Sequence, residues 1–233
     1  MRVAIMQPYF LAYIGYYQLI HSVDKFVIYD NIKYTKKGWF NKNRILTNGK
    51  DKLFTIPLKS DSEYLHVNER FIADSYNKER HKIIQWIKNS YKKAPFYKEN
   101  IQFIESLFNQ DNSNLFDFIY FSVNQVCNLL KIETEIIQSS KLEIDHSLKS
   151  EDKVLAICKF LNTDTYINAI GGKELYSKEK FKQNNISLNF IRTRKIQYEQ
   201  FSNEFFPWLS IIDVLMYIGV EKTKEMIYEF DLE

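Results

Sequence analysis

The sequence predicts an α/β fold, in which a β-hairpin and a helical subdomain are inserted into a parallel, Rossmann-like sheet. Two observations lead to this prediction. Apolar runs of strand length alternate with helical patterns in the first thirty residues and again after residue 133, as in a parallel sheet. Between these halves, a hairpin signature is followed by three consecutive helical patterns. The chain has 233 residues, which is enough for one large domain with an insertion.

The first thirty residues are predicted to form a strand, a helix and a second strand. Residues 3–6 are continuously apolar, as a strand buried on both faces requires, and Pro8 ends this run. Apolar side chains then recur at helical spacing over residues 13–20. Residues 26–29 form a second apolar run, which ends at Asp30. The pattern is typical of two parallel strands joined by a helix.

The next hundred residues predict the insertion. An Asn48-Gly49 pair lies between two β-prone runs, residues 44–47 and 53–58, and this is the strongest short hairpin signal. The periodicity then becomes helical, with Asn77 as the expected first cap. Three helices are expected, over about residues 77–91, 98–108 and 114–130.

The alternating pattern returns after residue 133. Strands are expected over residues 133–138, 165–168 and 186–192, and helices from Ser150 and over residues 174–183. An apolar helix begins at Ser210 and closes at Gly219, and a last short helix follows from Glu221. We therefore predict a single domain over residues 1–233. Its core comprises residues 1–30 and 133–192, its inserted hairpin and helical subdomain residues 31–132, and its C-terminal helices residues 207–233.

Each predicted parallel strand ends in polar residues. They are Gln7 with Tyr9, Asp30 with Asn31, Ser139 with Ser140, Asn168 with Gly171 and Gly172, and Arg192 with Arg194. Because the carboxyl ends of parallel strands lie at one edge of the sheet, where open α/β sheets bind their ligands, we expect a shared pocket there. Such side chains match a polar, multi-hydroxyl or phosphorylated ligand.

The Gly171-Gly172 pair has two interpretations. At the start of a predicted helix, free backbone N–H groups and the helix dipole favour an anion such as phosphate or carboxylate. A tight turn that needs a positive φ at glycine is the alternative. The sequence carries neither Gly-x-Gly-x-x-Gly nor the P-loop pattern, so it has no standard nucleotide fingerprint.

Three further features carry candidate chemistry. Trp39 can stack on a sugar or base beside Asn41, while Arg44 can hold phosphate or carboxylate; the alternative is a solvated loop with Trp39 in the core. His146 follows a strand end and can act as a general base, or it can simply face solvent. Asp213 lies inside an apolar helix, where a carboxylate needs a partner or a pocket unless it points outward.

Composition and spacing exclude several classes of function. The four His residues have no partner at i+3 or i+4, and Cys127 and Cys158 form no Cys-x-x-Cys pattern, so we expect no metal. Both cysteines are expected to be buried, in a reducing compartment. A net charge of +3 is too small to indicate nucleic-acid binding. Neither a signal peptide nor a run of about 18 apolar residues is found, so we expect a cytoplasmic chain with no membrane span.

These motifs resemble those of the WbqC-like protein family, and the likeness covers nearly the whole chain in the expected order. The matching segments are Met6-Gln-Pro-Tyr-Phe10, Tyr13-Ile-Gly-Tyr-Tyr-Gln-Leu-Ile20, Asp24-Lys-Phe-Val-Ile-Tyr-Asp30, Gly38-Trp39, Asn41-Lys-Asn-Arg-Ile45, Lys93-Ala-Pro95, Tyr166-Ile-Asn168 with Gly171-Gly172, and Ser210-Ile-Ile-Asp-Val-Leu215. Ala12 and Lys42 stand where the family commonly has Pro and Arg.

The resemblance implies a function in bacterial surface-polysaccharide assembly, because such proteins are associated with O-antigen gene clusters. It implies a transferase whose partners are a nucleotide-linked amino sugar and an acyl or aminoacyl donor. In this interpretation Asp30, His146 and Gln7 are the candidate catalytic residues, and Asp30 or His146 moves the proton. The candidate substrate-binding residues are Tyr9, Tyr13, Asn31, Trp39, Asn41, Arg44, Ser140, Asn168, Gly171, Gly172, Arg192 and Arg194.

Two other functions stay open at this point. A protein that binds a sugar or scaffolds glycan assembly needs an aromatic-lined pocket but no base. A more distant resemblance to nucleotidylyltransferases and pantothenate synthetase implies an adenylate-forming ligase. The histidines of the His-x-Gly-His motif of those enzymes are replaced by Tyr13 and Tyr16 in this chain, which weakens the ligase alternative.

Overall fold

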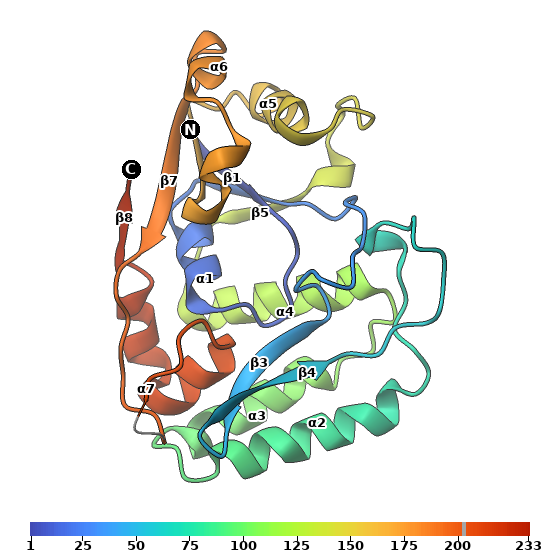
Figure 1. Cartoon of the computed structure of the whole chain (residues 1–233), viewed down its shortest axis with the longest axis vertical. Helices are drawn as coiled ribbons and strands as arrows, with labels where there is room; N and C mark the ends of the chain where they lie inside the picture. The colour runs from blue at the N-terminus through green and yellow to red at the C-terminus, as the bar shows by residue number, and fades with distance from the viewer. Residues whose placement is uncertain (202–203) are drawn as a thin grey trace.

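The computed structural model describes residues 1–201 and 204–233, and within them it contains a six-stranded, mostly parallel sheet (Figure 1). The spatial order is β5-β2-β1-β6-β7-β8. The strands are β1 (Arg2–Met6), β2 (Lys25–Ile28), β5 (Glu135–Gln138), β6 (Thr165–Ala169), β7 (Ser187–Thr193) and β8 (Phe230–Leu232). The first five are parallel and β8 is antiparallel to β7. The predicted α/β class with a parallel sheet is confirmed.

The order of the strands reverses between β1 and β6. From β1 the chain proceeds to β2 and β5 on one side, and β6 and β7 lie on the other side. Arg2 pairs with Thr165 and Val3 with Tyr166, so the two central strands run in register. Open α/β sheets form their ligand crevice at such a reversal, outside the carboxyl ends of the strands. The topology therefore directs attention to the residues that follow β1 and β6.

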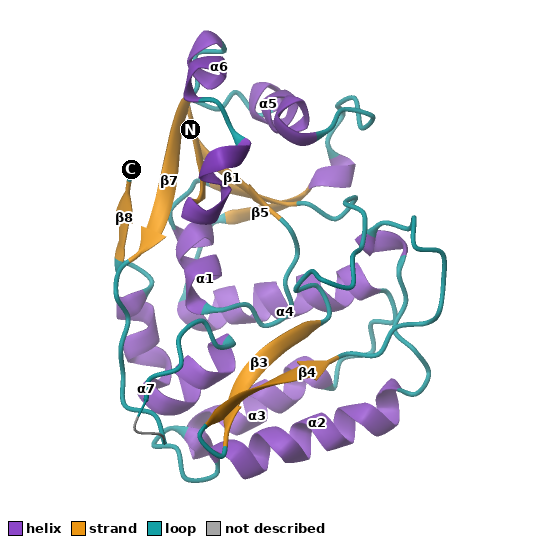
Figure 2. Ribbon diagram, in the orientation of Figure 1, coloured by secondary structure: helices purple, strands orange, loops and turns teal. Residues whose placement is uncertain are grey.

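Helices cover both faces of the sheet (Figure 2). On one side lie α5 (Ser150–Phe160) and α6 (Lys178–Gln183), and on the other α1 (Ile14–His21) and α4 (Leu115–Leu130). Successive side chains of a strand point to opposite faces. In β1, Val3 and Ile5 accordingly pack with α5, while Ala4 packs on the opposite side with α1 and α4. Burial on both faces explains the continuous apolar run of β1.

The insertion forms the predicted hairpin and three helices. The hairpin consists of β3 (Lys42–Thr47) and β4 (Lys50–Thr55), and the helices are α2 (Tyr76–Tyr91), α3 (Tyr97–Phe108) and α4. Asn48 and Gly49 have φ values of 51° and 71°, as a two-residue hairpin turn requires. Strand β4 therefore starts directly after the turn, earlier than expected. Ser75, and not Asn77, is the residue that precedes α2.

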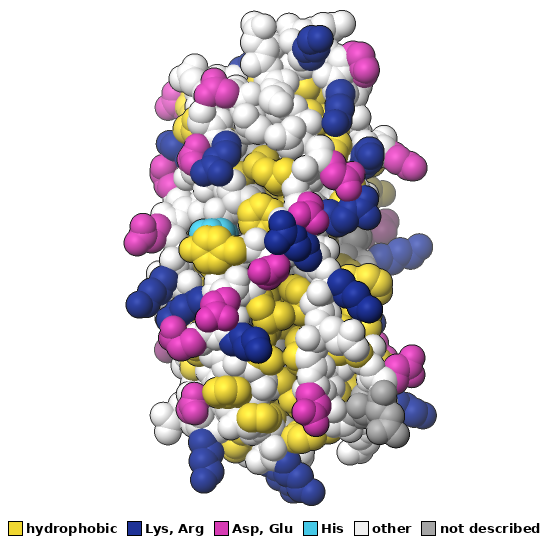
Figure 3. Space-filling view, turned by 90° about the vertical axis from the view of Figure 1, so that its left-hand side faces the viewer, with side chains coloured by type: hydrophobic (Ala, Val, Ile, Leu, Met, Phe, Trp, Pro, Cys, Tyr) yellow, Lys and Arg dark blue, Asp and Glu magenta, His cyan; other side chains and the backbone are white. Residues whose placement is uncertain are grey.

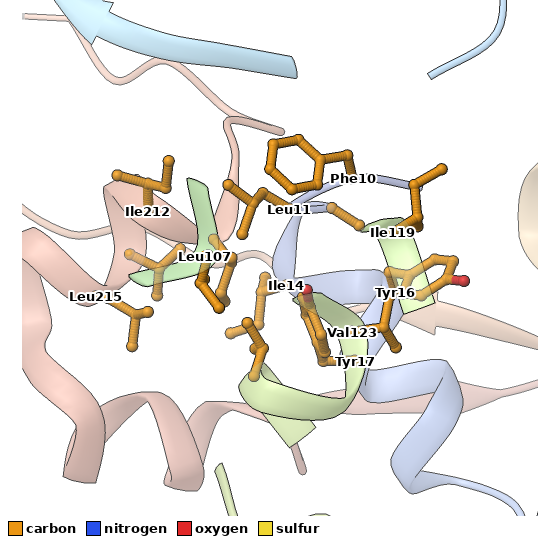
Figure 4. Packing of buried hydrophobic residues seen from close by; sticks show 14 of the residues in the cluster. Phe10, Leu11, Ile14, Tyr16, Tyr17, Leu107, Ile119, Val123, Ile212 and Leu215 are labelled. Carbon is orange, nitrogen blue, oxygen red and sulfur yellow. The ribbon is translucent and has the colours of Figure 1, made fainter. Parts of the chain in front are cut away.

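The insertion and one face of the sheet share a single core. Figure 4 shows side chains from the segment after β1 and from α1, namely Phe10, Leu11, Ile14, Tyr16 and Tyr17, packed against those of other elements. Those others are Leu107 of α3, Ile119 and Val123 of α4, and Ile212 and Leu215 of α7 (Ile211–Met226). The inserted helices α3 and α4 therefore pack against α1, which in turn covers one face of the sheet.

Two predictions about the second half need correction. Residues 174–183 do not form one helix: a 3₁₀ helix covers Ile170–Leu175, and α6 starts only after Ser177, whose hydroxyl accepts from Lys180 N. The C-terminal segment is not purely helical. α7 is kinked at Gly219, where a break was expected, but the chain then adds β8 to the edge of the sheet. A three-residue strand carries too little pattern to be recognised in a sequence.

Ion pairs border the edge formed by β7 and β8. The Arg192 guanidinium is 2.7 Å from Glu233, and that of Arg194 is 2.8 Å from Asp231 and 3.3 Å from Glu229. Figure 3 shows charged side chains of both signs on this side of the molecule, with hydrophobic ones between them. Charged side chains at a sheet edge oppose pairing with another chain. Within the described part of the chain, no helix is long and apolar enough to cross a membrane.

Candidate functional site

A cleft of about 850 Å³ lies at the point where the strand order reverses. Four chain segments form its walls. The polar and aromatic lining residues are Gln7, Tyr9, Tyr13 and Tyr16 after β1, Tyr29 after β2, Lys149, Ser150 and Glu151 at the start of α5, and Asn168, Gly171, Gly172, Glu174 and Tyr176 around the end of β6. The size is that of a small-molecule or cofactor site.

Hydrogen bonds from two tyrosines fix Gln7 at the end of β1. The Tyr16 hydroxyl donates to the Gln7 backbone carbonyl at 3.0 Å, and the Tyr9 hydroxyl donates to Gln7 Oε1 at 3.2 Å. The first bond holds the segment that joins β1 to α1, and the second orients the carboxamide. Gln7 Nε2 makes no hydrogen bond within residues 1–201 and 204–233. It is therefore available as a donor in the cleft.

Asn168 supplies a second carboxamide, from the end of β6. Its Oδ1 accepts from the Ala169 backbone N–H at 2.8 Å, which orients the side chain. A Cβ atom added at Gly172 would lie only 2.8 Å from Asn168 Nδ2, whereas one added at Gly171 would have no atom within 4 Å. Gly172 therefore leaves room for the Asn168 amide. Neither glycine has a positive φ, so the pair is not the turn that was considered.

The start of α1 also borders the cleft. This helix has no side-chain cap and no acidic residue in its first turn, so its first N–H groups are not neutralised by the protein. Lys149 supplies a positive charge and Glu174 a negative one. Neither of these two side chains has an ion pair or hydrogen bond within the described chain. Both charges are therefore free to interact with a ligand.

The tyrosines of the cleft are hydrogen-bond donors at neutral pH. Burial raises the pKa of Tyr9, Tyr13, Tyr29 and Tyr176 above the ordinary value of 10.0. Their hydroxyls accordingly keep their protons, and their rings offer apolar faces. Aromatic faces combined with hydroxyl donors are typical of sites for sugars and bases.

Asp30 lies beside the cleft but is 2% exposed. Its Oδ1 accepts from Ser139 Oγ and Ser140 N, each at 2.9 Å, and its Oδ2 accepts from Ser140 Oγ and from Asn68 Nδ2. These bonds join the end of β2 to the 3₁₀ helix Ser139–Lys141 and to the insertion. Both carboxylate oxygens are thus fully engaged. The arrangement connects the segment after β2, which includes the cleft residue Tyr29, to two other segments of the chain.

His146 has both ring nitrogens engaged. The Lys153 ammonium donates to Nδ1 at 3.0 Å, and Asn31 Nδ2 lies 2.9 Å from the same atom. Because an ammonium group only donates, Nδ1 accepts and the ring hydrogen is on Nε2, which donates to the Leu142 carbonyl at 3.0 Å. Lys153 itself is 1% exposed, and burial lowers its pKa. His146 therefore orients Lys153 and Asn31.

Comparison with known proteins gives the family. The sequence model of the WbqC-like protein family matches residues 7–225.

The chain belongs to the WbqC-like protein family.

The chain is also 24% identical over 224 residues to "Uncharacterized protein Rv1507c" of Mycobacterium tuberculosis (strain ATCC 25618 / H37Rv). That match covers 94% of this chain and 95% of the relative. No solved structure gives a significant match. The family resemblance drawn from the sequence motifs is confirmed, and the polar and aromatic residues of the cleft named above lie within the matched region.

The WbqC-like fold brings some of the predicted site residues together. The cleft contains Gln7, Tyr9, Tyr13, Asn168, Gly171 and Gly172. Asp30, Asn31, Ser140 and His146 are adjacent, joined by the hydrogen bonds just described. Gly171 and Gly172 lie within a six-residue 3₁₀ helix and do not start an α-helix, and anion binding there stays a prediction.

Other predicted site residues lie elsewhere in the WbqC-like chain. Arg192 and Arg194 are held by acidic residues at the β8 edge, as described above. Arg44 Nη1 is 2.7 Å from Asp51 within the hairpin, and Trp39, 38% exposed, has the Arg44 guanidinium 5.6 Å from its ring. Asn41 is buried and donates to the Ile56 carbonyl. None of these five residues lines the cleft.

Sequence reasoning missed several residues of the WbqC-like cleft. Tyr16, Tyr29, Tyr176, Lys149 and Glu174 line the cleft but are not among the predicted site residues. The usable signal was position: Tyr29 directly follows the end of β2, and Lys149 directly precedes the start of α5. Among the described residues, no group of three or more His, Cys, Asp or Glu could hold a metal. Cys127 and Cys158 are buried, which raises each pKa to about 12.

Proposed function

We propose that this WbqC-like protein is an enzyme that transfers an acyl group to the amino group of a nucleotide-linked sugar in surface-polysaccharide assembly. The observation that carries the proposal is the cleft at the strand reversal. There two oriented carboxamides, five tyrosines and two unpaired charges face a space of about 850 Å³. This combination is suited to a polar ligand with both ring-shaped and anionic parts.

The cleft offers a partner for each part of such a substrate. The carboxamides of Gln7 and Asn168, on neighbouring strand ends, bind sugar hydroxyls. The exposed faces of Tyr9, Tyr29 and Tyr176 stack on the sugar or the base. Lys149 and the uncapped start of α1 attract the diphosphate. The anion is thus assigned to the first helix instead of the Gly171-Gly172 segment.

The transfer step needs an activated donor, which we take to be an acyl thioester. The sugar amine attacks the thioester carbonyl carbon, a C–N bond forms, and the C–S bond breaks. The amine loses one proton, which the Glu174 carboxylate accepts and then passes to the departing thiolate. Much of the acceleration comes from holding the two reactants together, as in other group transfers.

Glu174 is preferred here to Asp30 and His146 as the proton acceptor. Both oxygens of Asp30 and both ring nitrogens of His146 already take part in internal hydrogen bonds. Glu174 has no side-chain partner in the described chain and lines the cleft. In this assignment Asp30 and His146 are positioning residues, because they fix the segments from which Asn31 and Ser140 project.

The test is a product assay by mass spectrometry, with UDP-glucosamine and a series of acyl thioesters. We expect an increase in mass equal to the acyl group, and a loss of about 100-fold in kcat for Glu174→Gln. Glu133→Gln, an exposed carboxylate outside the cleft, is the matched control and should keep full activity. Tight UDP-glucosamine binding without turnover of any thioester would instead identify a sugar-binding protein.

A further inference from the structure

A second cavity lies next to the cleft, at the carboxyl end of β7. We call it the β7 cavity; it measures about 340 Å³ and is bounded by Tyr13, Arg194, Lys195, Ile196, Tyr198 and Trp208, with further apolar residues. Tyr13, at the start of α1, lines both this cavity and the cleft. Ligands in the two spaces would therefore meet at Tyr13. Two adjoining sites are what a transfer between two bound molecules requires.

One wall of the β7 cavity is fixed by a buried carboxylate. The Tyr198 hydroxyl donates to Asp213 Oδ2 at 2.7 Å, and Gln200 Nε2 donates to the same oxygen at 2.8 Å. The other oxygen of Asp213 accepts from the Tyr91 hydroxyl at 2.7 Å. Asp213 thus ties the loop after β7 to α2, and it holds the Tyr198 ring in place. These three donors are the hydrogen-bond partners that a buried carboxylate within an apolar helix requires.

The lining of the β7 cavity also contains an exposed and strained tryptophan. Trp208 is 70% exposed and has φ of 56°, a left-handed conformation that is rare for a bulky residue. Arg44 Nη2 donates to its carbonyl at 3.4 Å, and Ser210 N donates to the Arg44 carbonyl at 2.9 Å. The surrounding chain therefore holds this conformation. Backbone strain of this kind is concentrated at functional sites.

The charges around the β7 cavity are of one sign. Its lining includes Arg194 and Lys195 but no Asp or Glu among the described residues. Arg194 is engaged by Asp231 and Glu229, while the Lys195 side chain has no partner in residues 1–201 and 204–233. An apolar group with a neutral or negative end is therefore attracted. An ammonium group is repelled by Lys195, whose charge has no acidic partner, whereas the charge of Arg194 is offset by its two carboxylates.

We propose that the β7 cavity binds the apolar acyl group of the donor and selects it against an aminoacyl group. The donor assignment rests on the proposed function, whereas the selectivity for apolar anions does not. The cavity walls provide apolar contact, Tyr13 directs the reacting end towards the cleft, and Lys195 disfavours the free ammonium of an aminoacyl donor.

Calorimetric titration with octanoate and octylamine tests the proposal, since the two probes share a chain of equal length and differ in charge. We expect octanoate to bind more tightly than octylamine, and Lys195→Ala to reduce this difference. Ile196→Asp should weaken octanoate binding by about tenfold or more, because it places a carboxylate in the apolar wall. The controls are Phe160→Asp and Lys159→Ala, which change exposed residues of α5 outside both sites. Both variants should bind octanoate as tightly as the unaltered protein does.

Separate titration with UDP keeps the two proposals distinct. UDP binding to Ile196→Asp should be unchanged, which also verifies that this variant is folded. Any one of three results would overturn the selectivity of the β7 cavity. Octanoate does not bind at all, or it binds to Ile196→Asp as tightly as to the unaltered protein, or the unaltered protein binds octylamine as tightly as octanoate. If octanoate binds as expected but the octanoyl group is not transferred from its thioester to UDP-glucosamine, the β7 cavity is upheld as a binding site and the proposed transferase function is refuted.

Discussion

At the scale of single residues, adjacent glycines offer a matched test of the cleft. A methyl group at position 172 would lie 2.8 Å from Asn168 Nδ2, while one at position 171 would meet no atom within 4 Å. We expect Gly172→Ala to displace the Asn168 carboxamide and weaken UDP-glucosamine binding by about tenfold, measured by calorimetry. Gly171→Ala is the control and should bind normally. Equal affinities for the two variants would show that Asn168 does not contact the sugar.

The buried carboxylate of Asp213 predicts a pH dependence of stability. Burial raises the pKa of Asp213 above its ordinary value of 3.8, so the folded protein holds this proton more tightly than the unfolded chain does. Raising the pH from 3.8 through the folded pKa therefore lowers the free energy of unfolding. We expect the unaltered protein to lose stability relative to Asp213→Asn over this interval, as measured by urea unfolding. A difference that stays constant with pH would contradict this.

Residue types alone could not assign the roles at the site. Gln7 and Asn168 were found because strand ends are recognisable in a sequence, and a parallel sheet places them together. Arg44, Arg192 and Arg194 have the same chemistry in the sequence, but acidic residues engage them: Asp51 across the hairpin pairs with Arg44, and the C-terminal Glu233 and Asp231 pair with Arg192 and Arg194. Gln18 was unpredictable for the same reason: it is buried in α1, donates to the Met226 and Glu229 carbonyls, and accepts from Thr193.

At the scale of elements, the kink of α7 depends on one residue. Gly219 has φ of 76°, and a Cβ atom there would lie 2.6 Å from Phe96 Cδ1. We expect Gly219→Ala to lower the free energy of unfolding by about 1–3 kcal/mol, measured by urea unfolding. Lys222→Ala, an exposed change in the same helix, should alter it by less than about 0.5 kcal/mol. A Gly219→Ala protein of unchanged stability would mean that the kink relaxes without strain.

Elements were predictable where a local pattern was long or a turn was specific. The apolar runs of β1 and β2, the Asn48-Gly49 turn and the helical period of α4 are such cases. β8 was missed because it has three residues and forms only by pairing with β7. The division between the 3₁₀ helix Ile170–Leu175 and α6 was missed because Ser177 can either continue a helix or cap a new one.

At the scale of the whole molecule, the shared core predicts cooperative unfolding. Buried side chains of the sheet, such as Ala4 and Phe26, belong to the same cluster as those of α2, α3 and α4. We expect the insertion and the sheet to unfold in one transition, with coincident curves from far-ultraviolet circular dichroism and from fluorescence of the three tryptophans. Two separate midpoints would show that residues 31–132 form an independent unit.

The neighbouring positions of β2 and β5 have a consequence for the order in which the chain folds. Lys25 pairs with Glu135, about 110 residues later in the sequence, so this contact closes a very long loop. On the ribosome, β1 and β2 emerge well before β5 and β6 can join them, while the hairpin and α2 to α4 need only local contacts. We therefore expect the helical insertion to collapse first on to α1 and to hold the two early strands until their partners are synthesised. Slow folding and transient exposure of β2 to chaperones follow from this topology.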